Sequence, residues 1–510
     1  MMENGVVLMD PASDADVIIV GGGISGLATA WFLREANPSI RVLVLEAEER
    51  VGGKISSTSI GGVQVDSGPD AFLARVEGAV ELAHAVGLGD DLIAPATGKA
   101  WLWSRNKLRA LPDGLVLGVP SRFRPLATSG ILSASGLARA AWGAVRGGSG
   151  SYAAVGDDPT VTQAIGRHLG QEVVDRLVDP LLGGINASSS ARLSLRSAAA
   201  NLSGPAASPR LMTALQEQGA AAARGNIGVE VGATQRPVFL APRSGVHALV
   251  EQLRQQLGDV IRSGVRVSVV SSSSSISSPA PQTEQSAAAE PDQSGQSGQS
   301  RQRWAVETSA GTLHAQSVIL ATPAFISAQL IEQDNPLLAN EMAAIRTASV
   351  ALTQLTFPAS AVQLPTGSGM LVPRVENRFM TASSWWNQKW PHLQIPGQVL
   401  IRASTGRDGD DRFTQLDDNE VVVNLCRDLR DMLGITVSPT EARVTRWDNG
   451  FPQYDSGHAD RVERIQRALT TTPGLFITGA SYTGIGIPAC IRSAKATAAS
   501  CFVTANNNRL

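Results

Sequence analysis

Residues 16–46 read DVIIVGGGISGLATAWFLREANPSIRVLVLE. The β-branched run Asp16–Val20 is typical of a buried strand, the glycines of Gly21–Gly26 predict a tight turn, and Leu27–Ala36 has the apolar spacing of a helix. Arg41–Leu45 returns to strand character and is followed by a glutamate. A strand, a helix and a second strand within about 30 residues predict a βαβ unit at the start of a doubly wound α/β sheet.

The glycine turn has the spacing of a dinucleotide site. In Gly21-x-Gly23-x-x-Gly26, the first glycine permits the tight turn, the second lets the backbone approach a pyrophosphate, and the third lets helix and sheet pack closely. Ile24–Ser25 opens the helix, whose N-terminus favours an anion. The carboxylate of Glu46 suits a ribose diol and repels the 2′-phosphate of NADP. These residues do not decide between FAD and NAD as the ligand. A glycine turn that binds no ligand also stays possible.

The composition is that of an ordinary globular protein of two or three domains. Of 510 residues, 43% are hydrophobic and 17% are charged, so a sizeable core is available. A net charge of −2 without a long basic stripe gives no electrostatic argument for a nucleic-acid partner. Cys426, Cys490 and Cys501 lack metal-ligand spacing, so we predict no metal site and expect reduced thiols in a cytoplasmic protein.

The apolar runs are too interrupted for a transmembrane helix. The longest uncharged runs are Thr347–Pro373 and Ala468–Ile491, and proline, glycine and hydroxyl residues break both. Residues 1–16 do not combine a basic start with an apolar stretch, so no targeting signal is predicted. We therefore expect a cytoplasmic location with at most a peripheral contact to a membrane.

Further segments resemble the superfamily of flavin-dependent amine oxidases and desaturases. They are EAEERVGGK at Glu46–Lys54, DSGP at Asp66–Pro69, FITGA at Phe476–Ala480 and GIGIPACI at Gly484–Ile491. NAD dehydrogenases do not carry the first of them, so the resemblance implies FAD as the cofactor. Beyond the glycine turn and Glu46, it implies cofactor contacts from Ala47, Arg50, Gly53, Lys54, Gly68, Pro69, Val267, Trp447, Gly479, Gly486, Ile487 and Pro488.

An ordered set of segments resembles a narrower group, the HemY-type porphyrinogen oxidases of heme biosynthesis. The set comprises SGPDAF from Ser67, LPDG from Leu111, LLGGI from Leu181, MLVP from Met370, KWPH from Lys389, RW from Arg446 and PQY from Pro452. The resemblance implies an oxygen-dependent, six-electron oxidation of a porphyrinogen to a porphyrin. Because the chemistry would reside at N5 of the flavin, no side chain is assigned as a catalytic residue.

The resemblance leaves two substrates open, coproporphyrinogen III and protoporphyrinogen IX. The KWPH run and the closing glycine motif look more like the group that forms coproporphyrin III, which is therefore favoured over protoporphyrin IX. We expect Met370, Leu371 and Ala382 to contact the substrate.

Trp101–Leu111 holds two short strand-like runs on either side of Arg105–Lys107, which predicts a hairpin. Relatives often carry an arginine near the start of this hairpin that pairs with a propionate. Here Lys99 or Ala100 occupies that place, and a lysine holds a carboxylate less rigidly.

Two rival functions stay open at this point. A flavin-dependent amine oxidase or carotenoid-type desaturase would share fold and cofactor, but the only tyrosines, Tyr152, Tyr454 and Tyr482, make an aromatic cage for an amine hard to supply. A non-catalytic flavin-fold binding protein is the other rival. The favoured function implies a porphyrinogen and O2 as partners and a possible hand-over of product to a ferrochelatase. It leaves the oligomeric state open.

We expect a Rossmann-like FAD-binding domain, a mixed-sheet substrate domain and an inserted, mainly helical domain. Apolar residues recur at helical spacing from Val161 to Leu181, whereas residues 271–302 are too polar to form a packed core. The expected limits are a disordered N-terminus at 1–15, FAD-binding parts at 16–86, 230–325 and 456–510, a substrate and helical insertion at 87–205, a disordered loop at 271–302 and a substrate-binding domain at 326–455.

Overall fold

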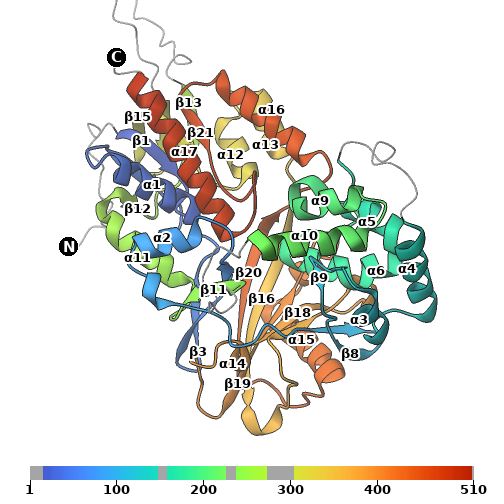
Figure 1. Ribbon diagram of the computed structural model, residues 1–510. Helices are drawn as coiled ribbons and strands as arrows, with labels where there is room; N and C mark the ends of the chain where they lie inside the picture. Colours follow the sequence, from blue (N-terminus) through green and yellow to red (C-terminus); the bar gives the residue numbers. More distant parts are fainter. Residues whose placement is uncertain (1–14, 148–157, 226–236, 273–303, 508–510) are drawn as a thin grey trace, which may run out of the picture.

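The computed structural model describes residues 15–147, 158–225, 237–272 and 304–507. Two large sheets and a group of helices meet near the centre of the molecule (Figure 1). We call them the cofactor region, the substrate sheet and the helical region. This mixed α/β architecture confirms the predicted fold class.

The cofactor region is built on a sheet that the N-terminal βαβ unit starts. Its strand order is β12-β2-β1-β15-β14-β13, with β21 beside β15. The strands are β1 (Ala15–Val20), β2 (Val42–Leu45), β12 (Ile261–Arg262), β13 (Val267–Ser272), β14 (Trp304–Thr308), β15 (Gly311–Leu320) and β21 (Leu475–Ile477). Strands β12, β2, β1, β15 and β21 run parallel, and β13 and β14 are antiparallel. The first and last strands of the chain thus meet in one sheet.

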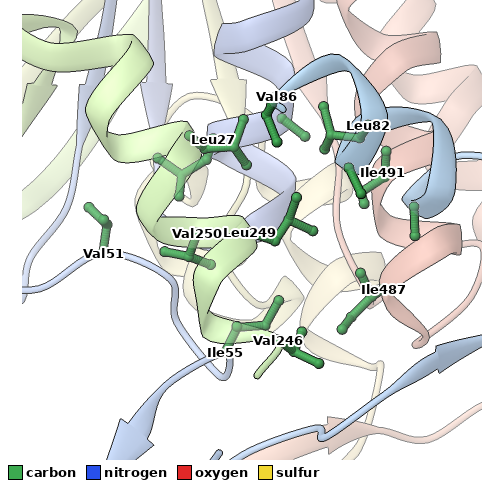
Figure 2. Close-up of a cluster of buried hydrophobic side chains, with 14 of the residues drawn as sticks. Leu27, Val51, Ile55, Leu82, Val86, Val246, Leu249, Val250, Ile487 and Ile491 are labelled. Carbon is green, nitrogen blue, oxygen red and sulfur yellow. The ribbon is translucent and has the colours of Figure 1, made fainter. Parts of the chain in front are cut away.

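Helices from distant parts of the sequence share one core beside this sheet (Figure 2). They are α1 (Ile24–Ala36), α2 (Ala79–Ala85), α11 (His247–Leu257) and α17 (Ile487–Asn507). Leu27, Leu249 and Ile491 are fully buried where these helices meet. Val51 and Ile55 pack into the same core, so the glycine-containing loop between them is anchored at both ends.

The opposite face of the sheet carries a second apolar core. It is covered by α12 (Ala324–Ile331), α13 (Pro336–Ala343) and α16 (His458–Thr470). Burial on both faces explains why β1, β2 and the last three residues of β15 are nearly continuous runs of valine, isoleucine and leucine.

The substrate sheet has the order β20-β16-β19-β18-β17-β7-β8. Its strands are β7 (Trp101–Ser104), β8 (Lys107–Ala110), β16 (Thr347–Pro358), β17 (Gly369–Leu371), β18 (Met380–Trp385), β19 (Gln398–Thr405) and β20 (Glu441–Pro452). One face packs on α15 (Asp418–Leu433), which buries Leu425 and Leu429. The other face points toward the cofactor and helical regions.

The helical region is inserted between parts of the two sheets. It comprises α3 (Phe123–Thr128), α4 (Ala134–Arg146), α5 (Val161–Leu169), α6 (Gln171–Val173), the π-helix η3 (Val174–Gly183), α7 (Gly184–Asn186), α8 (Leu195–Ala198), α9 (Ala200–Ala207) and α10 (Leu211–Gly225). A capping box at Thr160 starts α5, and Val161, Ile165 and Leu169 are buried as their spacing predicts.

Shorter elements complete the chain. They are the hairpin β3 (Ser57–Ile60) and β4 (Val63–Asp66), the pair β9 (Leu115–Val116) and β10 (Val119–Pro120), the strands β5 (Phe72–Leu73), β6 (Leu92–Ile93) and β11 (Phe239–Pro242), the short helix α14 (Trp386–Lys389), and the 3-10 turns η1 (Gly89–Asp91), η4 (Gly258–Val260), η6 (Ala359–Ala361), η7 (Arg374–Glu376) and η8 (Arg412–Gln415).

The structure confirms the predicted hairpin and corrects two predicted boundaries. Arg105 and Asn106 form the turn between β7 and β8 with φ values of 56° and 55°. Ala15 belongs to β1, and Ser271 and Ser272 belong to β13, because all three pair with neighbouring strands; predicting them as disordered was wrong. The remainder of the predicted disordered segments, 1–14 and 273–302, lies outside the described residues.

Candidate active site

The glycine turn is packed as tightly as the fingerprint requires. Gly21 has a φ of 108°, and a Cβ at Gly26 would collide with the Gly21 carbonyl oxygen. Gly23 differs, because a Cβ there would meet no atom within 4 Å. The helix begins at Ile24–Ser25, directly behind this open space. The turn therefore presents backbone N–H groups and the N-terminus of α1 to a ligand that comes close to Gly23.

A second glycine pair lies against the first turn. The Gly52 N–H donates to the Gly22 carbonyl at 2.8 Å, and a Cβ at Gly53 would lie 3.3 Å from the Gly23 Cα. The Arg50 guanidinium donates to the Gly53 carbonyl at 3.0 Å. The close approach of two backbones thus explains the paired glycines.

Glu46 organises the same turn from the end of β2. Its carboxylate accepts the Gly22 N–H at 2.8 Å and the Glu48 N–H, across Ala47, at 2.9 Å. The Glu46 carbonyl accepts the Val265 N–H at 2.8 Å, which brings the start of β13, and with it Val267, beside the end of β2. The predicted nucleotide contacts therefore lie together.

The closing segment, Phe476–Ile491, lies beside the N-terminal glycine turn, although the two are at opposite ends of the sequence. Gly479 has a φ of 127°, and its Cβ would lie 3.9 Å from the Ser25 hydroxyl. After Gly486, α17 begins at Ile487–Pro488, and the thiol of Cys490 lies against Ser25. Two helix N-termini thus converge on one place, as a bound pyrophosphate would need.

A cavity of about 530 Å³ lies next to these turns. Its lining residues are Glu48, Arg50, Lys54, Ser56, Ser57, Thr58, Ser67, Thr445, Arg446, Trp447, Asp448 and Gly450. Trp447 donates from its indole N–H to the Ser67 carbonyl at 3.2 Å. A Cβ at Gly68 would collide with the Lys54 carbonyl oxygen, so this strand end, with Pro69 after it, runs directly beside the Lys54 loop.

Lys54 lines this cavity with a charge for which the described part of the structure shows no partner. Burial lowers the pKa of its ammonium group, and no hydrogen bond or ion pair reaches it within the part of the chain that the structure describes. A half-buried cation without a partner favours an anionic ligand. Together with the open space at Gly23 and the paired helix N-termini, it fits the phosphates and ring system of FAD.

A buried ion cluster holds the strand end at Gly68 in place. Asp70 contacts Lys389 at 2.6 Å and Arg402 at 3.1 Å, and Arg402 also donates to the Gly68 carbonyl at 2.8 Å. Burial alone would raise the pKa of Asp70, but the two cations outweigh it and lower that pKa strongly. The cluster ties β19 of the substrate sheet to the predicted flavin strand end.

Tyr454 holds the closing segment in place. Its hydroxyl donates to the Ala480 carbonyl at 2.6 Å and accepts the Gly484 N–H at 2.7 Å. His458 stacks on the Tyr454 ring at 4.0 Å and contacts the Tyr482 carbonyl through Nε2 at 3.0 Å. The PQY pattern alone predicts no role for this tyrosine, because nothing local indicates a partner so far along the chain.

The strand register places Trp447, Ala382 and Leu371 on one face of the substrate sheet. Trp447 pairs with Val350, Ala382 with Ser404, and Leu371 with Ala382, and these positions share one side of the pleat. This face, which we call the substrate face, extends from β20 to β17 across four strand spacings, or about 19 Å. Gly184 of the helical region lies at its far end, where an added Cβ would be 3.6 Å from the Leu371 Cδ2.

Two predicted substrate residues lie elsewhere. Met370 is buried on the opposite face of the sheet, in the core that packs on α15, because neighbouring residues of a strand point to opposite sides. Lys99 is exposed just before β7, and its carbonyl accepts the Ser368 N–H at 2.7 Å. The structure therefore does not group these side chains with Leu371 and Ala382.

The described residues hold neither a metal-type cluster nor a membrane-spanning helix. No group of histidine, cysteine, aspartate or glutamate side chains there has the arrangement of a metal site. No helix in the same ranges combines the length and apolar character needed to cross a bilayer.

Comparisons with known proteins agree with this geometry. The family described as flavin containing amine oxidoreductase matches residues 24–501. Coproporphyrinogen III oxidase of Bacillus subtilis is 32% identical over 492 residues, covering 94% of this chain and 96% of its own. The enzyme of the same name from Staphylococcus aureus is 29% identical over 493 residues, covering 94% and 98%.

A solved structure extends the likeness to the fold. The crystal structure of a protein of Exiguobacterium sp. 255-15, provisionally named protoporphyrinogen oxidase, superposes with a TM-score of 0.76 at 26% identity. It covers 96% of this chain and 99% of its own. The cofactor region and the substrate sheet both fall within the matched length. The chain therefore belongs to the flavin containing amine oxidoreductase family, as a HemY-type, FAD-dependent porphyrinogen oxidase relative.

Proposed function

We propose that this protein oxidises a porphyrinogen to a porphyrin with FAD and O2, and that coproporphyrinogen III is the preferred substrate. The observation that carries the proposal is the 32% identity to coproporphyrinogen III oxidase of Bacillus subtilis over 94% of this chain. That length includes the cofactor turns, the cavity and the whole substrate sheet. Similarity confined to the turns would have supported only a flavoprotein.

The proposed FAD-binding residues come from both ends of the chain and from β20. The N–H groups at Gly23 and the start of α1 bind phosphate, Gly21 shapes the turn that lets the cofactor approach, Glu46 binds ribose, and Lys54 pairs with a negative charge of the cofactor. FAD supplies the acceptor for the hydride that leaves the substrate. The remaining proposed contacts are Ile24, Ser25, Gly26, Ala47, Arg50, Gly53, Gly68, Pro69, Val267, Trp447, Gly479, Gly486, Ile487 and Pro488.

The substrate face suits a broad, mostly apolar ring system. It begins at Trp447, which lines the cofactor cavity, and ends at Leu371 under the helical region. Arg402 is the charged group of this face nearest the cofactor strand end, and Gly68 and Asp70 occupy it. With no uncommitted acid or base identified there, the side chains position the substrate and exclude water, which agrees with chemistry supplied by the cofactor.

The direct test is a paired assay under air with the purified holoprotein. Coproporphyrinogen III and protoporphyrinogen IX are supplied in parallel, and porphyrin fluorescence is followed against the spontaneous rate. We expect both to be oxidised, with the larger kcat/KM for coproporphyrinogen III. A Lys54→Met variant, which removes the unpaired cation of the cavity, is expected to retain less flavin and to lose activity in proportion.

The amine oxidase alternative makes the opposite prediction. Bleaching of the flavin by an amine, without porphyrin formation from either porphyrinogen, would overturn the proposal. Tyr454 is bonded to the closing segment and Tyr482 is buried, and neither lines the cavity, so neither is free to form an amine cage. Oxygen as the acceptor, a cytoplasmic location and product transfer to a ferrochelatase stay predictions.

A further inference from the structure

Three consecutive backbone carbonyls after the β3–β4 hairpin bond to side chains of the substrate sheet. The donors are Gln354 of β16, Trp447 of β20 and Arg402 of β19, which bind the carbonyls of Asp66, Ser67 and Gly68 at 3.3, 3.2 and 2.8 Å, respectively. The three strands are neighbours in the order β20-β16-β19. Residues 66–68, which we call the strand end, are therefore tied to three adjacent strands.

The strand register places all three donors on the substrate face. Gln354 pairs with Arg402 across β16 and β19, and Val350 of β16 pairs with Trp447 of β20. Side chains at even spacing along a strand point to the same side, so Gln354, Val350 and their partners share one face of the sheet. The strand end thus lies on the part of the substrate face that is nearest the cofactor region.

The opposite side of the strand end belongs to the cofactor region. The Ser67 N–H donates to the Ser56 carbonyl at 2.9 Å, and the hydroxyls of the same two residues are 2.7 Å apart. A Cβ at Gly68 would collide with the Lys54 carbonyl oxygen. The strand end therefore connects the loop beside the glycine turns with the substrate sheet.

The side-chain donors replace the strand pairing that ends at this point. β4 stops at Asp66, whose partner Ser57 is the first residue of β3. Ser67 and Gly68 are buried beyond the hairpin, and buried carbonyls need a donor. Because the donors come from one sheet, they determine how the peptide planes of the strand end are turned.

Gln354 is the donor with no other contact to explain it. Its side chain is fully buried, and the Asp66 carbonyl can bond only to its Nε2, because Oε1 is itself an acceptor. Within the described ranges, this arrangement leaves Oε1 buried without a partner. An unpaired buried oxygen lowers stability, so packing alone would favour an apolar side chain here. The bond to Asp66 is what the amide provides.

The other two donors have further contacts. Trp447 lines the cofactor cavity, and Arg402 forms an ion pair with Asp70. A substitution at either position would also change the cavity or the local charge. Gln354 is neutral and does not belong to the cavity lining. It is therefore the position at which the strand end can be released with the least other change.

We propose that Gln354 is a positioning residue of the reaction, which acts through the Asp66 carbonyl on the peptide planes that border the bound flavin. This inference rests on the proposed function and its FAD contacts at Gly68 and Pro69. Protein groups beside a flavin tune its electronic properties, and peptide dipoles are such groups. Because Gln354 is fully buried, its loss should change the rate of hydride transfer and leave porphyrinogen binding unchanged.

The test compares Gln354→Met with Thr353→Val in the flavin-loaded protein. Methionine has a similar length but no N–H. Thr353 is the next residue of β16, points to the opposite face, and is also fully buried with an unpaired oxygen among the described residues, so it controls for the loss of a buried polar atom. The flavin reduction potential and visible absorption are measured without substrate, and kcat and KM with coproporphyrinogen III.

We expect Gln354→Met to retain FAD but to shift the reduction potential and the absorption band of the flavin. Its kcat should fall about 2- to 10-fold, as the loss of one hydrogen bond predicts, with KM nearly unchanged. Thr353→Val should behave as wild type in all four measurements.

The outcomes separate this inference from the proposed function. An unchanged potential and absorption band in Gln354→Met would overturn the inference, as would an equal shift in Thr353→Val or a raised KM with wild-type kcat. If Gln354→Met does not fold, Gln354→Asn, whose amide is too short to reach Asp66, takes its place. A wild-type protein that oxidises no porphyrinogen would instead refute the proposed function, and the comparison of flavin potentials would still stand.

Discussion

The cofactor turns and the seam between the substrate sheet and the helical region, where Arg374 and Arg407 lie, are held together by different forces. At the turns, backbone meets backbone: Gly52 bonds to Gly22, and Gly53 lies against Gly23. At the seam, long side chains from different elements meet around few carboxylates, and some polar atoms stay unpaired. The first region depends on the absence of side chains and the second on their charge.

This difference predicts how each region responds to change. A backbone contact tolerates no added atom, so substitution there is expected to act on folding. A buried charge cluster loses stability when one partner is removed, because the remaining charge is left without a counter-ion.

The largest effect is expected at the glycine turn. Gly26→Ala places a Cβ against the Gly21 carbonyl oxygen, so we expect little folded protein and no bound flavin. Gly23→Ala has open space in the apoprotein, so it should melt like wild type yet retain less FAD. Yield, visible flavin absorbance and the melting temperature of the apoprotein measure both. Wild-type flavin content in Gly26→Ala would contradict the backbone argument.

Asp70→Asn is expected to have the next largest effect. It leaves Lys389 and Arg402 buried without a carboxylate, which costs about 3–5 kcal/mol of the free energy of unfolding. Denaturant melts measure it. Asp460→Asn, which breaks an exposed pair with Arg196, is the control and should change stability by less than about 1 kcal/mol.

The same carboxylate predicts an acid dependence. Because the folded-state pKa of Asp70 is lowered, its stabilisation is complete above the unfolded value of about 3.9 and is lost as pH falls toward the folded value. The stability difference between wild type and Asp70→Asn should therefore shrink below about pH 4. A difference that stays constant there would show that the lost stability does not come from charge.

Tyr454→Phe should have a moderate and local effect. It removes the hydroxyl that joins the Ala480 carbonyl to the Gly484 N–H, at a cost of about 1–3 kcal/mol. We expect faster FAD dissociation and faster amide exchange in residues 479–486, with the substrate sheet unchanged. Uniformly faster exchange across the protein would indicate global destabilisation instead.

The smallest effect is expected from His458. Burial lowers its pKa from 6.5, so the folded state favours the neutral ring. Its contribution to stability is complete above pH 6.5 and declines as pH falls from there toward the lowered folded value. His458→Gln should therefore lose less stability than wild type between neutral and mildly acidic pH. Parallel curves for the two proteins would refute this.

The substrate face shows where prediction from sequence stopped. Met370 and Leu371 were both expected to contact substrate, but neighbours in a strand point to opposite faces, and the register with β18 puts Leu371 on the substrate face. The resemblance identified this segment as part of the substrate site but did not show which of its side chains face the substrate. Lys99 had the expected charge, yet it is exposed before β7.

The sequence by itself determined the βαβ start, the dinucleotide turn and the cofactor class. Those features depend on local spacing: glycines where no Cβ fits, an acid after the second strand and a helix behind the turn. Only the tertiary structure decided that Lys54 is unpaired, that Tyr454 anchors the closing segment and that Arg374 and Arg407 share a seam. These are balances of charge and hydrogen bonding among residues far apart in the chain, and no local pattern records which partner each group will find.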